Sequence, residues 1–381
     1  MANNLPQAGA SGDDIFYQEL QACHGITAGD PFVAVSHGTS TAGLAGAATN
    51  NGKGIASYNW NVKVMPLQAL GDDGSGWTSQ IVAAIYYAVD NGAHIINLSL
   101  GGDTKDTSLE AAVNYAYSHG VTIIAAAGNC GTGGESGCNP ASPGAMSYPA
   151  LYDHVIAVGA TDATDTRASF SSFGPGLDIL APGAGGIVAP LIYRGQTPAD
   201  PNSFNYSSAY SASLYGTSFA APMVSSLASL VKATRPAATP DEITAILDGT
   251  AAKPASMTST YYTPAYGHGL IDAGSVITVA RSFNSTAPTT PQLLQTGDNR
   301  SEHTFSSTAT LSSGCKVPAN TYCTVRVTDT HGHDRYLPFA LASTAGSTGW
   351  QWPGSTLQSG EWFVRAVQGD KSSSTYHLFS K

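Results

Sequence analysis

The sequence predicts an α/β protein with a mostly parallel sheet, followed by a small β-sandwich-like domain. The chain has 381 residues, more than one core usually organises, so two domains are expected. From Asn61 onward, short apolar runs alternate with helix-like stretches, as in a parallel sheet with crossover helices. After Val279 the sequence becomes rich in Ser, Thr and Pro and then alternates with a period of two. We expect a larger domain over residues 1–280, a linker over 281–291 and a β-domain over 292–381.

The strands of the parallel sheet are predicted from runs that are almost continuously apolar, as is typical of strands covered on both faces. These runs are 62–70, 94–100, 121–127, 155–160 and 177–180. Two stretches between them place apolar residues on one helical face, so each helix can bury a stripe against the sheet. The stripes are Ile81, Ile85, Ala88 and Val89, and Leu109, Ala112, Val113 and Ala116.

The end of the larger domain contains a helix start signal. Thr239 is expected to be the N-cap, Pro240 the first helical residue and Glu242 a capping glutamate. In the tail, residues 323–328 and 362–367 alternate with the period of β-strands.

Composition and charge exclude several classes of protein. Hydrophobic residues make up 42% of the chain and charged residues 11%, which suits a compact fold with many turns. The net charge of -10 and the lack of a basic run argue against binding to nucleic acid or an anionic membrane surface. No apolar stretch is long enough for a transmembrane helix, and residues 1–4 lack the features of a signal peptide.

Four of the five cysteines form two short-range pairs, Cys130 with Cys138 and Cys315 with Cys323. Each pair closes a loop that contains Gly or Asn, and disulfide geometry can accommodate such loops. Disulfides are favoured over free thiols or a metal site, and they predict export to an oxidising compartment. Cys23 is left over, either as a buried thiol or as a cysteine that has lost its partner.

Three motifs carry residues suited to nucleophilic catalysis. His37 opens a helix of small residues, and Ser218 begins a helix whose N–H groups would face developing negative charge. Asn129 follows an apolar strand, at the edge where open α/β sheets gather functional residues. Each alone could be structural: a surface histidine, an N-cap serine or a turn-forming asparagine. Their occurrence in one chain favours a shared site.

Six segments, in order along the chain, resemble the signature blocks of subtilisin-like serine peptidases (subtilases, peptidase family S8). They are His37-Gly38-Thr39, Ser99-Leu100-Gly101-Gly102, Ala126-Ala127-Gly128-Asn129, Ala181-Pro182-Gly183, Gly216-Thr217-Ser218 and Tyr266-Gly267-His268-Gly269-Leu270. The resemblance implies a three-layer fold with a seven-stranded parallel sheet. It implies a secreted serine endopeptidase that cleaves proteins or peptides through an acyl-enzyme.

The resemblance also implies roles for individual residues. Ser218 would be the nucleophile, His37 the general base, and Asn129 would donate to the oxyanion together with the Ser218 N–H. The residues implied to contact the substrate are Gly74, Ser75, Gly76, Ser99, Leu100, Gly101, Ala126, Ala127 and Gly128. The pocket walls contain no acid, so we expect a preference for apolar over basic residues before the cleaved bond.

The chain departs from the family pattern in three ways. Ser40, Phe219, Met223 and Ser226 occupy positions near the site where the family often has other residues, and an insertion lies between Gly183 and Tyr215. The catalytic aspartate has no counterpart: none of Asp13, Asp14, Glu19 and Asp30 follows a strand-like run or precedes Gly as required. We therefore expect that the sequence starts inside a longer gene product, and that the chain as written hydrolyses peptides poorly.

The remaining expectations concern ligands and alternatives. The resemblance implies no cofactor for the chemistry; calcium often stabilises family members, but no loop identifies a site. The expected partners are substrates and a propeptide of the full-length product. A non-catalytic pseudo-peptidase that serves as a scaffold is the alternative function, whereas a lipase-like hydrolase lacks its Gly-x-Ser-x-Gly motif. In the tail, Trp350, Trp352 and Trp362 are expected in the core rather than in a sugar-binding face, and residues 331–334 in a turn rather than a metal site.

Overall fold

The computed structural model describes the larger part of the chain. The described residues are 32–71, 74–133, 138, 142–191, 209–257, 260–285, 291–295, 302–305, 310–330, 334–343, 346–353, 360–368, 371–372 and 376–380. The predictions for Cys23, for the four acidic residues before His37 and for residues 331–333 lie outside these ranges.

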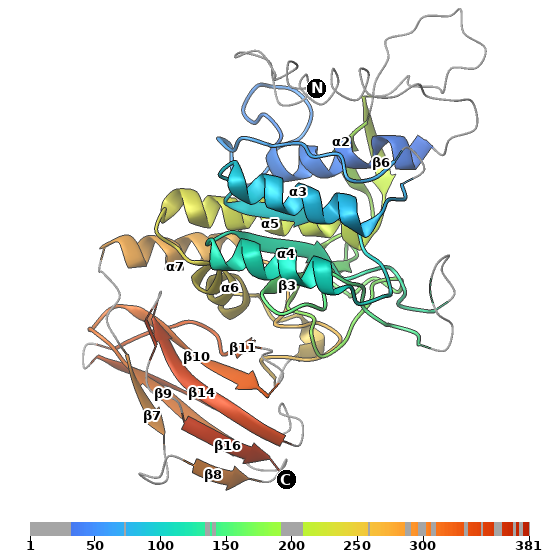
Figure 1. Cartoon of the computed structure of the whole chain (residues 1–381). Helices are drawn as coiled ribbons and strands as arrows, with labels where there is room; N and C mark the ends of the chain where they lie inside the picture. Colours follow the sequence, from blue (N-terminus) through green and yellow to red (C-terminus); the bar gives the residue numbers. More distant parts are fainter. Residues whose placement is uncertain are drawn as a thin grey trace, which may run out of the picture.

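A parallel four-stranded sheet forms the centre of the larger domain (Figure 1). Its order is β1 (Ile95–Leu98), β2 (Thr122–Ala126), β3 (Val155–Thr161) and β4 (Ile179–Pro182). Every residue of β2 and β3 is buried, as the continuous apolar runs predict. The four runs that begin at residues 94, 121, 155 and 177 are thereby confirmed as strands.

Helices cover both faces of this sheet and give the three-layer arrangement predicted from the resemblance (Figure 1). On one face, α3 (Thr78–Asp90) and α4 (Thr107–Ser118) share a core with Ile123 and Ala125 of β2. On the other face, α5 (Thr217–Thr234), α6 (Pro240–Gly249) and α7 (Ala273–Ser285) pack against Ile124 and Ala126. The alternation of side chains along β2 therefore separates two cores.

A smaller unit surrounds the N-terminal half of α5. It comprises α2 (Phe32–Gly46) and the antiparallel hairpin of β5 (Ile187–Pro190) and β6 (Tyr210–Leu214). Leu44, Ile187, Ala189 and Phe219 form its buried apolar cluster. This cluster fixes α2 to α5, which is the contact that positions the candidate site.

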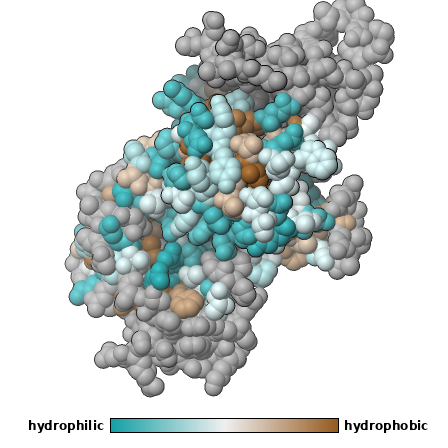
Figure 2. All heavy atoms as spheres, in the orientation of Figure 1, coloured by the Kyte–Doolittle hydropathy of each residue, from teal (hydrophilic) through white to brown (hydrophobic). Residues whose placement is uncertain are grey.

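The predicted strand over residues 62–70 is wrong. This segment is irregular, and Val64, Met65 and Leu67 are 39%, 40% and 37% exposed. A strand requires a hydrogen-bonded neighbour, and among the described residues β1 pairs only with β2. The described sheet consequently has four strands instead of the seven that the resemblance implies. Figure 2 shows a mainly hydrophilic face with hydrophobic side chains gathered near α2 and α3.

Helix α6 starts where the sequence predicts. The Thr239 hydroxyl accepts from the Glu242 N–H at 3.2 Å, and Pro240 is the first helical residue. The Glu242 carboxylate, predicted to cap the helix, forms a 2.5 Å ion pair with Arg235. A buried carboxylate is stabilised more by a guanidinium than by a backbone N–H.

The C-terminal region forms two mainly antiparallel sheets, as predicted for a β-sandwich-like unit. The larger sheet has the path β11-β10-β14-β16-β8, and the smaller sheet has the order β13-β9-β7. The strands are β7 (Gln292–Gln295), β8 (Glu302–Phe305), β9 (Thr310–Lys316), β10 (Tyr322–Asp329), β11 (Asp334–Tyr336), β12 (Ala340–Leu341), β13 (Ser347–Pro353), β14 (Gly360–Gln368), β15 (Lys371–Ser372) and β16 (Tyr376–Ser380). A short 3₁₀ turn (Ala255–Met257) precedes them in the larger domain.

Both predicted disulfides are present. Cys130 is bonded to Cys138, and Cys315 of β9 is bonded to Cys323 of β10, which joins the two sheets of the tail.

Trp350 and Trp362 are buried in the tail core, as predicted. Helix α7 continues to Ser285, so it overlaps the start of the predicted linker at 281–291; the domain division itself stays a prediction.

Candidate active site

The N-terminus of α5 is the centre of the candidate site. Gly216 is its N-cap with a φ of 139°, a conformation that L side chains rarely adopt. Ser218 therefore lies inside the first helical turn, and the alternative reading of Ser218 as an N-cap is wrong. The first-turn N–H groups and the helix dipole favour negative charge at this point.

The Asn129 side chain lies beside this turn. Its Oδ1 accepts from the backbone N–H of Thr217 at 2.9 Å and from the Thr217 hydroxyl at 3.0 Å. The carboxamide oxygen is therefore occupied, which directs the Nδ2 donor away from Thr217. Among the described residues no acceptor is bonded to this Nδ2, so it can serve an external oxygen. Sequence reasoning missed the role of Thr217, although the residue belongs to the motif that contains Ser218.

His37 reaches the same helix end from α2. Its ring packs against that of Phe219, the residue after Ser218, with the centroids 5.6 Å apart. The helix already begins at Phe32, so His37 lies in the second turn instead of opening the helix as predicted. The Ser218 hydroxyl itself donates to the Ser99 carbonyl at 3.4 Å. His37, Asn129 and Ser218 thus lie around one end of α5, from three separate parts of the sequence.

Burial governs the electrostatics of His37. Desolvation lowers the pKa of its imidazole below the ordinary value of about 6.5. Within the described ranges, no carboxylate lies within 4.0 Å of the His37 ring, so nothing there opposes this shift. The neutral imidazole is the form that can accept a proton from a serine hydroxyl.

The predicted pocket walls leave the sheet side by side. Leu98 of β1 pairs with Ala125 of β2, so residues 99–101 and 126–128 follow adjacent carboxyl ends. Ser99 ties its wall to the site, since its hydroxyl donates to the Ser218 carbonyl at 2.7 Å. Ala126 and Ala127 are buried, Ser99, Leu100 and Gly128 are half-buried, and Gly101 is exposed. Gly74, Ser75 and Gly76 lie in the exposed loop before α3.

Ser147 lies between the two walls, and sequence reasoning missed it. A Cβ added to Gly101 would lie 2.7 Å from the Ser147 Cβ, and one added to Gly128 would lie 2.6 Å from its hydroxyl oxygen. The Ser147 N–H also donates to the Ala127 carbonyl at 2.9 Å. Only the tertiary fold brings Ser147 here, since no motif contains it. It adds a hydroxyl and no charge to the walls.

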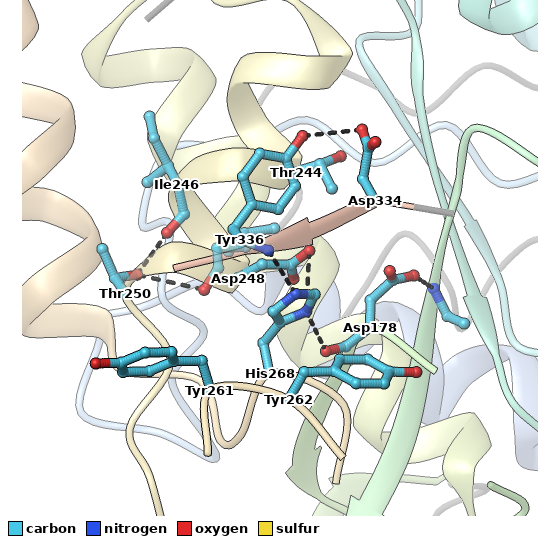
Figure 3. Close-up of polar contacts among 12 residues, drawn as sticks. Asp178, Thr244, Ile246, Asp248, Thr250, Tyr261, Tyr262, His268, Asp334 and Tyr336 are labelled. Carbon is cyan, nitrogen blue, oxygen red and sulfur yellow. Dashed lines mark hydrogen bonds and ion pairs between the residues drawn. The ribbon is translucent and has the colours of Figure 1, made fainter. Parts of the chain in front are cut away.

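One group of described residues has side chains suited to a cation: Asp178, Asp248 and His268, with ligand atoms within 4.8 Å of one another (Figure 3). The Nε2 of His268 accepts from the Tyr336 N–H at 2.8 Å. A neutral imidazole that accepts at Nε2 carries its proton on Nδ1, which lies 3.0 Å from the Asp178 carbonyl oxygen and 3.4 Å from Oδ2 of Asp248. Nδ1 then has no lone pair for a metal, so these residues do not fit a calcium or transition-metal ion.

The chain is similar to known proteins over most of this region. The model of the subtilase family matches residues 33–269. The subtilisin Savinase of Lederbergia lenta is 40% identical over 237 residues, which cover 62% of this chain and 76% of that protein. A thermophilic serine proteinase of Bacillus sp. (strain AK1) is 43% identical over 202 residues, 53% of this chain and 44% of that protein. The chain therefore spans less than half of one curated relative that it matches.

A solved structure described as proteases from Pseudoalteromonas arctica PAMC 21717 is similar in fold. The TM-score is 0.51 with 31% sequence identity, over 64% of this chain and 70% of that chain. Within the described residues, no helix is long and apolar enough to cross a membrane.

Proposed function

The chain belongs to the subtilase family, and we propose that it acts as a serine endopeptidase with Ser218 as nucleophile, His37 as general base and Asn129 as oxyanion donor. The observation that supports this proposal is that His37 packs against Phe219 and Asn129 accepts from Thr217, the two neighbours of Ser218 in the first turn of α5. Each of the three proposed residues has the chemical character that acyl transfer needs at that position.

In the proposed reaction, the Ser218 oxygen attacks the peptide carbonyl while His37 takes the hydroxyl proton. The carbonyl oxygen becomes negative and accepts hydrogen bonds from the Asn129 Nδ2 and the Ser218 N–H. His37 then gives its proton to the leaving amine, and an acyl-enzyme remains. Water, activated by the same imidazole, attacks the ester and regenerates the Ser218 hydroxyl.

A third residue is needed to orient His37 and to stabilise its cationic form. No carboxylate in the described ranges contacts the ring, so we propose that the triad aspartate lies outside them. In the serine-protease template, loss of this function lowers kcat by about 10⁴. In the sequence, none of the four acids before His37 fits this role, so the 381-residue protein is expected to hydrolyse peptides slowly. The missing carboxylate contact also favours the alternative function, a non-catalytic scaffold. The presence of His37, Asn129 and Ser218 together argues against that alternative.

Substrate preference is proposed from the walls around Ser147. The side chains at 99–101, 126–128 and 147 carry no charge, so a basic residue before the cleaved bond would find no counter-ion. We propose a preference for apolar residues at this position. Cleavage of a peptide library by an active form, mainly after Arg or Lys, would reject it.

The cellular setting is part of the proposal. Two disulfides are stable in an oxidising compartment, so we propose export from the cell and protein or peptide substrates. A propeptide as a partner and a structural calcium ion stay predictions. The net charge of -10 disfavours nucleic acid as a partner.

The proposal is tested by activity and by active-site labelling. The 381-residue protein and a protein extended with any in-frame sequence found upstream of Met1 are compared on a fluorogenic peptide and with a fluorophosphonate. We expect slow hydrolysis by the first, fast hydrolysis by the second, and labelling on Ser218 that the Ser218→Ala variant lacks. If neither protein is labelled or cleaves the peptide, the scaffold alternative replaces the enzyme. Fast hydrolysis by the 381-residue protein that Ser218→Ala abolishes would contradict the missing-acid argument.

A further inference from the structure

The tail docks on the larger domain through β11 and the residues that follow it (Figure 1). The Phe339 N–H donates to the Gly249 carbonyl of α6 at 2.7 Å, and the Arg335 guanidinium lies 4.2 Å above the Tyr262 ring. At the centre of this contact, the Tyr336 N–H donates to Nε2 of His268 at 2.8 Å. A side chain of one domain thus satisfies a buried backbone group of the other.

His268 is fully buried, and its hydrogen bonds fix its tautomer (Figure 3). Nε2 accepts from Tyr336, so the proton lies on Nδ1. Nδ1 is 3.0 Å from the carbonyl oxygen of Asp178 and 3.4 Å from Oδ2 of Asp248. The neutral imidazole therefore donates within the larger domain and accepts from the tail.

Charged groups from several elements face His268. Asp248 belongs to α6, Asp178 precedes β4, and Lys253 follows α6 and donates to the His268 carbonyl. The tail and the loop before His268 supply the remaining titratable groups, namely Asp334, Arg335, Tyr336, Tyr261 and Tyr262. Burial and the positive charges of Lys253 and Arg335 hold the pKa of His268 well below its usual value.

We propose that His268 is a proton-sensitive lock between the peptidase domain and the C-terminal β-domain, closed by its neutral form and opened by acid. A second proton would sit on Nε2 and face the Tyr336 N–H, so the interdomain bond would become a contact between two donors. The resulting cation would also be buried beside Lys253 and Arg335. This inference does not depend on the proposed catalysis.

The other groups titrate with the opposite effect or outside the acid range. Burial raises the pKa of Asp248 and of Asp334, so their docked forms bind protons more readily and favour docking as the pH falls. Burial lowers the pKa of Lys253 from 10.5 to about 8, so its effect on docking changes between those two pH values and stays constant in acid. The pKa of His268 is lower in the docked state than in the released state. Neutral His268 therefore supports docking above the ordinary pKa of histidine, and this support is lost as the pH falls through the pKa of the docked state. Among these groups, only His268 favours release in acid.

The test is hydrogen exchange, read by mass spectrometry on the 381-residue protein at pH about 7.5 and about 4.5. Exchange at 334–339 is compared with exchange at β2, after correction for the intrinsic effect of pH. We expect protection of 334–339 to fall at least tenfold in acid while β2 stays protected. In His268→Gln, residues 334–339 should stay protected at both pH values, because the side-chain amide oxygen can accept from the Tyr336 N–H and does not titrate. His268→Ala should lose protection at both, and Asp248→Asn should still release in acid.

Several results would overturn the proposal. In the parent protein, these are unchanged protection of 334–339 in acid, or loss of protection at β2 at the same pH. In the variants, they are an acid release by His268→Gln equal to that of the parent protein, or loss of the acid response in Asp248→Asn. If a variant does not fold, the NMR titration of the His268 ring in the parent protein decides. Its midpoint must coincide with that of the release, and a midpoint elsewhere rejects the lock.

Discussion

Thr217 fixes which end of the Asn129 carboxamide faces the proposed oxyanion. Its N–H and its hydroxyl both donate to Oδ1, and its hydroxyl oxygen accepts from the Gly128 N–H at 3.2 Å. An amide has a donor end and an acceptor end of nearly equal size, so only such contacts distinguish them. Thr217 is thus a positioning residue for Asn129.

We expect Thr217→Val to lower kcat by roughly 10- to 100-fold with little change in KM, because only the backbone N–H of residue 217 then holds the carboxamide oxygen. Complete loss of such a donor costs ~10²–10³ in kcat, a value taken from another subtilisin-like enzyme. The readouts are hydrolysis of a fluorogenic peptide by an active form and the rate of Ser218 labelling by a fluorophosphonate. Thr217→Ser keeps the hydroxyl and should restore most of both rates. Equal losses in the two variants would contradict the role.

The sequence predicts site residues only where they belong to a recognisable motif. Ser218, His37 and Asn129 could be proposed because each belongs to a short sequence segment that resembles a family signature block. Ser147 escaped because its position depends on Gly101 and Gly128, which leave space for it only in the folded sheet. Such through-space packing has no periodic signal in the chain.

At the scale of elements, the β5–β6 hairpin determines where α2 lies. The buried Ser40 hydroxyl donates to the Pro190 carbonyl at 2.7 Å, one helical turn after His37. Gly43 faces the same proline, and a Cβ there would lie within 2.5 Å of the Pro190 ring. The distance between His37 and the N-terminus of α5 therefore depends on this contact.

We expect Gly43→Ala to destabilise the protein by about 1–3 kcal/mol, the usual cost of overpacking a tight contact. The measurement is urea unfolding followed by tryptophan fluorescence. Gly38→Ala is the matched control, since a Cβ at Gly38 meets nothing within 4 Å in the same helix. That change should stabilise the helix by up to about 1 kcal/mol. A Gly43→Ala protein as stable as the Gly38→Ala protein would show that the hairpin does not constrain α2.

The elements themselves were predictable where one physical signal dominated. The apolar runs of β2 and β3 correspond to strands that are buried at every residue, and Thr239 and Pro240 mark the start of α6. The segment 62–70 is interrupted by Lys63, Pro66 and Gln68 and has no described neighbour to bond, so its apolar residues predicted a strand that is not formed. Strand pairing is a non-local property that hydrophobicity does not encode.

At the scale of the whole molecule, the tail and the larger domain share apolar surface. Phe339 lies against the core formed by α5, α6 and α7, with its ring 6.0 Å from that of Phe283. Gly249 permits this approach, because a Cβ there would lie 2.7 Å from the Phe339 ring. The Arg326 guanidinium adds an ion pair with Asp241 of α6 at 3.7 Å. We infer that the two regions unfold together.

Phe339→Ala should separate the two unfolding events. Removing a buried phenylalanine ring costs about 3–5 kcal/mol, and we expect about 2 kcal/mol here because Phe339 is partly buried. Scanning calorimetry of the parent protein should show one transition, and the variant should show two, since the lost contact is the one that couples the regions. Leu341→Ala, which removes a side chain that is 50% exposed in the same strand region, should leave a single transition. Two transitions already present in the parent protein would mean that Phe339 does not couple the domains.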